Sequence, residues 1–126
     1  MSEAKILLVE DDPVVRLVTQ TQLQYLGYDC TSVGSGEDAL KADRQDINLI
    51  LMDIGLPGMD GIQTTVRLRE IEESQSGKHV PIIALTAHSN EDQCLLAGMD
   101  DFLQKPVLLG DLKAALEKWW PNSGGS

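Results

Sequence analysis

The stretch KILLVEDDP at residues 5–13 decides the fold of this chain. Its apolar run at residues 6–9 has the length of a buried strand, and three carboxylates follow it directly. Pro13 after Asp12 indicates the first turn of a helix, because aspartate caps helix N-termini and proline is favoured at the first helical position. The stretch therefore predicts a strand that ends in acidic residues and passes at once into a helix.

The same alternation continues along the chain. Five apolar runs are predicted strands, at residues 6–9, 28–33, 49–52, 82–85 and 102–103. Five longer segments are predicted helices, at residues 13–26, 35–43, 61–73, 90–97 and 109–119. Short strands that alternate with helices favour a parallel sheet covered on both faces. We therefore expect an α/β, doubly wound domain with a five-stranded parallel sheet and five helices.

Length and composition are those of one compact domain. The 126 residues suffice to bury a core, and Cys30 and Cys94 form neither a disulfide framework nor a zinc pattern. Without an apolar run of about 18 residues or a signal segment, we expect a cytoplasmic domain that makes no membrane contact. A net charge of −10 argues against direct binding of nucleic acid. We expect the domain to cover residues 1–120 and a flexible tail or linker to cover 121–126.

Polar residues follow four of the predicted strands. Ligands of open parallel sheets bind beyond the carboxyl ends of the strands, so these residues are expected to share one edge. The residues at that edge are Glu10, Asp11, Asp12, Asp53, Thr86 and Lys105. Asp12 alone is better explained as a helix cap, since Pro13 follows it. The others converge on one predicted site.

The predicted site suits phosphoryl transfer. Glu10, Asp11 and Asp53 are expected to lie within several ångströms of one another, where like charges need compensation by Lys105 and a divalent cation. Oxygen ligands without histidine or cysteine favour Mg²⁺. Asp53 can attack phosphorus as a nucleophile, and the Thr86 hydroxyl can donate to a phosphoryl oxygen.

Four segments together identify a known family. They are KILLVEDD at residues 5–12, LMDIGLPGMDG at 51–61, PIIALTA at 81–87 and GMDDFLQKP at 98–106. The chain resembles the receiver domain of two-component response regulators over residues 4–120. The resemblance implies a flavodoxin-like sheet with strand order 2-1-3-4-5 and a phosphoacceptor function with Mg²⁺ as cofactor.

The resemblance also implies a role for each matching residue. Asp53 is the expected phosphoacceptor, and Lys105 pairs with the phosphoryl group. Asp11, Asp53 and the Gly55 carbonyl are the expected metal ligands, and Glu10 acts through metal-bound water. Thr86 and Phe102 are the expected switch pair. Glu10 is aspartate in many relatives and Phe102 is often tyrosine; neither departure removes a group that phosphorylation needs.

The resemblance extends to context and partners. The segment at residues 97–106, with Leu112 and the Trp119-Trp120 pair, is most similar to receivers attached to hybrid sensor histidine kinases. We therefore expect a receiver without enzymatic turnover of its own. Its two candidate settings are the cytoplasmic part of a membrane-bound hybrid kinase and a stand-alone protein. The expected partner is a histidine kinase or a histidine phosphotransfer domain.

Two other functions use the same residues differently. A Mg²⁺-dependent phosphatase of the haloacid dehalogenase type also uses an aspartate nucleophile, but it carries a second aspartate where this chain has Gly55. A phosphorylation-independent interaction module would not need Asp11, Asp53, Thr86 and Lys105 together. Both alternatives are therefore less favoured than the phosphoacceptor.

The first predicted helix carries more apolar residues than a core face requires. They are Val14, Val15, Leu17, Val18, Leu23, Tyr25 and Leu26. At about 100° per residue they cover roughly 240° of the helix, about twice the arc that packs on a sheet. Val15 and Val18, one turn apart near Asp53, are the expected solvent-facing residues, and apolar side chains exposed beside a site suggest docking. The resemblance to receivers implies that the docked partner is the helical domain that carries the histidine.

Overall fold

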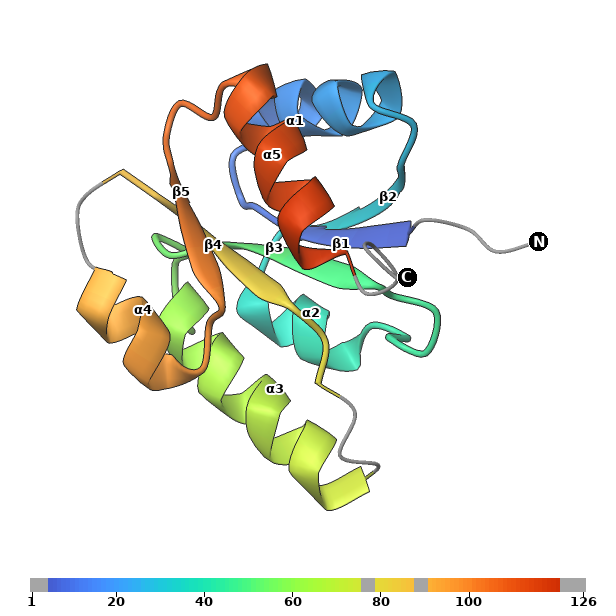
Figure 1. Cartoon of the computed structure of the whole chain (residues 1–126). Coiled ribbons are helices and arrows are strands. Elements are labelled where there is room, and N and C mark those ends of the chain that lie inside the picture. Colours follow the sequence, from blue (N-terminus) through green and yellow to red (C-terminus); the bar gives the residue numbers. More distant parts are fainter. Residues whose placement is uncertain (1–4, 76–78, 88–90, 121–126) are drawn as a thin grey trace.

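The structure, a computed structural model, describes residues 5–75, 79–87 and 91–120. Five parallel strands form one sheet in the order β2-β1-β3-β4-β5, which confirms the predicted class and strand order (Figure 1). The strands are β1 (Lys5–Val9), β2 (Asp29–Val33), β3 (Leu49–Asp53), β4 (Ile82–Thr86) and β5 (Asp101–Gln104). The helices are α1 (Pro13–Tyr25), α2 (Gly36–Lys41), α3 (Gly61–Gln75), α4 (Glu91–Ala97) and α5 (Leu109–Trp119). No helix in these ranges combines the length and the apolar character needed to cross a membrane.

The helices cover both faces of the sheet. α1 and α5 lie on one face, and α2, α3 and α4 lie on the other (Figure 1). Successive side chains of a strand point to opposite faces, so each strand feeds two cores. Leu7 and Ile50 pack into the core under α2, α3 and α4. Ile6 and Leu49 pack into the core under α1 and α5.

Most element boundaries fall within two residues of the predicted ones. β3 and β4 each run one residue further than expected, so Asp53 and Thr86 are the last residues of their strands. α2 ends at Lys41 instead of near residue 43, because Ala42 is extended and the Arg44 guanidinium binds the carbonyls of Ala39 and Leu40. Asn90, the expected start of α4, and the expected tail at 121–126 lie outside the described residues.

The carboxyl ends of β1 and β3 form the topological switch point of the sheet. β1 pairs with β2 on one side and with β3 on the other, so their connections leave toward opposite faces. A crevice opens where such connections diverge. The acidic residues after β1 and at the end of β3 therefore lie at the edge where ligands bind in this class of sheet.

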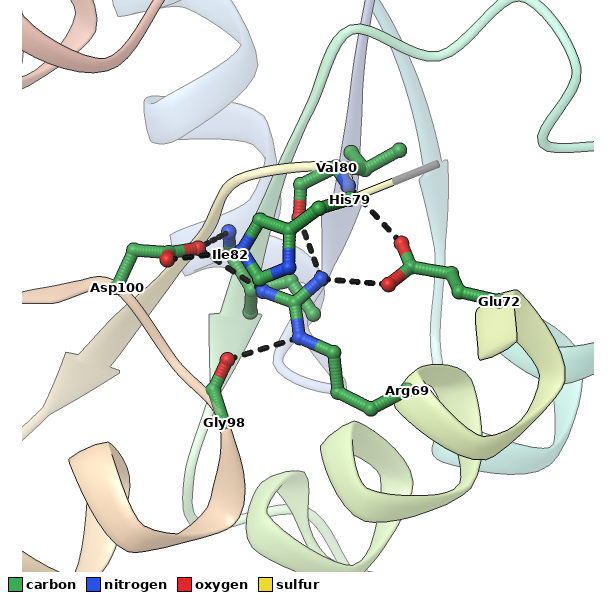
Figure 2. Close-up of polar contacts among 7 residues, drawn as sticks. All are labelled: Arg69, Glu72, His79, Val80, Ile82, Gly98 and Asp100. Carbon is green, nitrogen blue, oxygen red and sulfur yellow. Dashed lines mark hydrogen bonds and ion pairs between the residues drawn. The ribbon is translucent and has the colours of Figure 1, made fainter. Parts of the chain in front are cut away.

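Arg69 of α3 joins four segments near the amino-terminal ends of β4 and β5 (Figure 2). Its guanidinium donates to the carbonyls of Val80 and Gly98, each at 2.8 Å. It also forms ion pairs with Glu72 at 2.8 Å and Asp100 at 2.9 Å. The other oxygen of Glu72 accepts the Val80 N–H, and the other oxygen of Asp100 contacts the His79 ring nitrogen. Arg69 thus joins α3 to the approach to β4, the end of α4 and the start of β5.

Replacing Arg69 with methionine is expected to cost about 3 kcal/mol of unfolding free energy, because two carboxylates and two carbonyls lose a largely buried partner. The matched control is Arg67→Met on the same helix. Its ion pair with Glu70 spans 3.6 Å between side chains that are about 60% exposed, so the expected loss is under about 0.5 kcal/mol. Urea unfolding of both variants measures the difference, and equal losses would show that the network contributes little.

Candidate functional site

Three carboxylates meet at the carboxyl edge of the sheet. Oxygens of Glu10, Asp11 and Asp53 all lie within 4.8 Å of one another. Glu10 and Asp53 are buried, whereas Asp11 is exposed. They line a cleft of about 350 Å³, whose other described lining residues are Asp12, Val15, Ile54, Gly55, Thr86, Ala87 and Lys105. The predicted convergence of β1, β3, β4 and the segment after β5 is confirmed.

Lys105 compensates part of this negative charge. Its Nζ lies 2.9 Å from Asp53 Oδ1 and 3.0 Å from Glu10 Oε1. Burial acts to lower the pKa of Lys105, but the bonds to Asp53 and Glu10 outweigh burial and raise it. Burial raises the pKa of the Glu10 carboxyl, against the bonds that it accepts from the Asp12 N–H and Lys105. One ammonium therefore faces three carboxylates, and the cleft retains an excess of negative charge.

The two oxygens of Asp53 have different surroundings. Oδ1 accepts the Gly55 N–H at 3.1 Å and contacts Lys105. Oδ2 receives no hydrogen bond or ion pair from the residues that the structure describes. The carboxylate is thus fixed through Oδ1 at the wall of the cleft.

Asp12 is a helix cap, as expected. Its Oδ1 accepts the N–H groups of Val14 at 2.9 Å and Val15 at 3.2 Å, and Pro13 occupies the first turn. These bonds satisfy two donors that would otherwise have no partner in the helix. Asp12 therefore lines the cleft without being needed as a ligand.

The expected switch residues lie in neighbouring strands. Thr86 is buried and lines the cleft at the end of β4. Phe102 lies on β5, an edge strand, and 36% of it is exposed. Its register partner on β4 is Ala84, two residues before Thr86. The Phe102 ring is thus partly accessible on the surface of an edge strand, outside the group of residues that line the cleft.

The outer face of α1 is apolar, but its most exposed residues are not all the expected ones. Val18 is 52% exposed, whereas Val15 is partly buried because it forms a wall of the acidic cleft. Val14, Leu17 and Tyr25 are 64–78% exposed. The expectation that Val15 faces solvent freely is therefore only partly right.

A groove of about 380 Å³ lies beside α1 and was not expected from the sequence. Its lining is Val14, Val15, Val18, Thr19, Gln22, Leu85, Lys105, Pro106 and Val107. Gln22 fixes the far wall, since its Nε2 donates to the Val107 carbonyl at 3.0 Å. Pro106 and Val107 are 80 or more residues from α1 in the sequence, so no local pattern could have indicated this groove. Val15 and Lys105 line both the groove and the acidic cleft.

The cleft offers the donor set of a hard cation. Its ionisable ligands are carboxylates, and among the described residues that line it there is neither histidine nor cysteine. Mg²⁺ is usually bound by one or two carboxylates together with water and phosphate oxygens. The Asp53 carboxylate, the exposed Asp11 and the surplus of negative charge fit that ion.

The family model of the response regulator receiver domain matches residues 6–117. The sensor histidine kinase GacS of Pseudomonas protegens is 40% identical over 119 residues, which cover 91% of this chain and 13% of the kinase. The sensor histidine kinase RcsC of Escherichia coli K12 is 37% identical over 115 residues, which cover 88% of this chain and 12% of the kinase. The chain thus spans a small part of these curated relatives.

Two solved structures share the fold. The receiver domain of the Pseudomonas aeruginosa sensor histidine kinase PA1611, with a magnesium ion in its active site cleft, has a TM-score of 0.81 at 43% identity, covering 94% of this chain and 98% of that one. The Saccharomyces cerevisiae Ssk1 receiver, in complex with the histidine phosphotransfer protein Ypd1, has a TM-score of 0.85 at 26% identity. The match covers 96% of this chain and 91% of that one. With the family model matched over most of its length, the chain belongs to the response regulator receiver domain family.

Proposed function

We propose that Asp53 accepts a phosphoryl group from a phosphohistidine, with Mg²⁺ bound beside it. The observation that supports this most is the placement of Asp53, which is buried, held by Lys105 at 2.9 Å and within 4.8 Å of two further carboxylates. Phosphoryl transfer depends on positioning and charge neutralisation more than on acid–base groups. The cleft supplies both.

Six of the cleft residues would take part in this reaction. A bond forms between an Asp53 oxygen and phosphorus while the bond from phosphorus to the donor nitrogen breaks. Asp11, Asp53 and the Gly55 carbonyl would hold Mg²⁺, and Glu10 would contact the ion through a metal-bound water. The ion supplies positive charge to the phosphoryl oxygens, as does Lys105. Thr86 donates its hydroxyl to a further phosphoryl oxygen.

A small phosphodonor tests this function without any partner protein. Incubation with acetyl phosphate and Mg²⁺ is expected to add one phosphoryl group, detected by intact mass. Hydroxylamine should release the group, because an acyl phosphate is cleaved by this nucleophile whereas a phosphoserine or phosphothreonine is not. A chain that stays unmodified, or an adduct that resists hydroxylamine, would count against the proposal.

The relatives support a proposal for the natural donor and setting. A histidine kinase or a histidine phosphotransfer domain is the proposed donor, in keeping with the Ypd1 complex of the Ssk1 receiver. The resemblance to GacS and RcsC supports a place in a cytoplasmic part of a hybrid sensor kinase. The chain's own reactions would be its phosphorylation and dephosphorylation, with no turnover of an external substrate.

Replacing Asp11 with asparagine is expected to weaken Mg²⁺ binding at least about tenfold, since even residues that only orient metal ligands contribute that much. Metal-free stability should hold or rise, because one of three close carboxylates is removed. Asp12→Asn is the control, with the same change in net charge and a side chain that still caps α1. Calorimetric titration measures both affinities; an unchanged affinity in Asp11→Asn would exclude Asp11 as a ligand.

Phosphorylation is proposed to move Thr86 toward the phosphoryl group and to turn the Phe102 ring into the space left behind. Such a packing change would carry the signal to α4, β5 and α5. Beryllofluoride, which mimics the phosphoryl group, is expected to shift NMR signals of β5 and α5 as well as those of the cleft. In Thr86→Val the shifts should stay near Asp53. Shifts confined to the Asp53 loop in the unaltered protein would contradict the switch.

A further inference from the structure

The loop after Asp53 is held between two glycines that belong to different helices. This loop, residues 54–60, carries Gly55 and connects β3 to α3. Gly61 is the first residue of α3 and Gly36 is the first residue of α2, and both are buried. Neither glycine has a positive φ, so the backbone conformation does not require glycine at these positions.

Gly61 packs directly on the peptide of Asp53. A Cβ at Gly61 would overlap the Asp53 carbonyl oxygen and would lie 2.9 Å from both the Asp53 carbonyl carbon and the Ile54 Cα. The Gly61 N–H also donates to the Ile54 carbonyl at 3.1 Å. All three obstacles are backbone atoms, which cannot rotate away as a side chain can. A side chain at position 61 must therefore displace either α3 or the strand end that carries Asp53.

Gly36 packs on the other end of the loop. A Cβ there would overlap Thr64 Oγ1 and would lie 2.9 Å from the Met59 carbonyl oxygen. Thr64 is fully buried, and its hydroxyl donates to the Asp60 carbonyl at 2.7 Å. Because the hydroxyl is fixed in this way, a larger residue at position 36 must push on the loop.

Two further features hold the loop between these glycines. Asp60 and Gln63 form a capping box, in which each side chain accepts the other's N–H, at 2.8 and 3.1 Å. Leu56 is buried in the core near the middle of the loop. A displacement at Met59 or at Gly61 is therefore passed to Gly55, whose N–H binds Asp53 Oδ1 at 3.1 Å.

We infer that Gly36 and Gly61 are positioning residues for phosphorylation: their close backbone contacts set the Asp53 carboxylate and the Gly55 carbonyl relative to each other. This inference rests on the proposed function. Phosphoryl transfer is sensitive to such placement, since a shift of about 1 Å can cost on the order of a hundredfold in rate. α2, which contributes no side chain to the cleft, thereby acts on the site through Gly36.

The test compares alanine variants of four glycines in the full chain. Gly61→Ala and Gly36→Ala are expected to slow phosphorylation by acetyl phosphate by about tenfold or more and to weaken Mg²⁺ binding. Gly27→Ala is the matched control. Gly27 has φ +96°, so alanine strains the backbone there, but a Cβ at this position would have no atom within 4 Å. The variant should therefore destabilise the fold without displacing the loop. Gly110→Ala, which also meets nothing within 4 Å, should change neither property.

A suppressor variant separates positioning from stability. Thr64→Ala removes the hydroxyl that a Cβ at Gly36 would overlap, so it should restore part of the rate lost in Gly36→Ala, even though it removes the bond to Asp60. This double variant also serves if Gly61→Ala does not fold. Rates that follow thermal stability alone across all the variants, including Gly27→Ala, would overturn the inference, as would a double variant no faster than Gly36→Ala. A wild-type chain that forms no adduct would instead overturn the proposed function itself.

Discussion

Asp53→Asn is expected to abolish the hydroxylamine-sensitive adduct formed with acetyl phosphate. An amide is a far weaker nucleophile than a carboxylate and forms no acyl phosphate. The fold should persist, because asparagine retains an oxygen that can accept the Gly55 N–H and Lys105 keeps its ion pair with Glu10 at 3.0 Å. The measurement is intact mass after incubation with the phosphodonor and Mg²⁺, followed by peptide mapping of the unaltered protein.

The matched control for this substitution is Asp12→Asn. It removes the same charge at the same edge of the sheet. Asp12, however, caps α1 through hydrogen bonds that an asparagine side chain can also accept. The control should therefore be phosphorylated at close to the rate of the unaltered protein. An adduct that persists in Asp53→Asn would place the acceptor elsewhere, and loss in both variants would indicate that overall charge, not the identity of the nucleophile, controls labelling.

Changing Val15 and Val18 to lysine is expected to abolish phosphorylation by a protein donor and to leave labelling by acetyl phosphate nearly intact. Both residues line the apolar groove beside α1, and Val15 also lines the acidic cleft. We propose that a helical donor that presents a histidine to Asp53 covers this surface. Two charges buried under it without partners would cost far more than a rim contact contributes.

The structure sharpens this test in two ways. Because Val15 borders the cleft, Val18→Lys alone is the cleaner variant, and it should also retain the full rate with acetyl phosphate. Tyr25→Lys is the control on the same helix, since Tyr25 is 78% exposed, lies two turns from Val18 and is not among the residues that line the groove. The donor is found by transfer profiling against the phosphohistidine proteins of the source organism. If Val18→Lys and Tyr25→Lys impair that donor equally, or if acetyl phosphate fails in Val18→Lys, the groove is not the docking surface.

The sequence by itself determined the class of fold and the edge at which the chemistry lies. Strand and helix periods are local properties, and β3 and β4 are fully buried strands whose apolar runs are unmistakable in the sequence. The parallel order then brings the carboxyl ends of the strands together, so Glu10, Asp53 and Thr86 could be assigned to one site before any coordinates. The capping role of Asp12 could be predicted for the same reason, since a cap acts within three residues of itself.

Only the tertiary structure decided which atoms of that site are already engaged and what surrounds it. That Asp53 is held through Oδ1 depends in part on Lys105, 52 residues away. The groove depends on Pro106 and Val107 packing beside α1, and the buried role of Arg69 depends on carbonyls and carboxylates of four segments. The tight contacts of Gly36 and Gly61 could not be predicted from the sequence, because glycine is also common in ordinary turns. Distances between segments remote in sequence are set by packing of the whole core, and no sequence period encodes them.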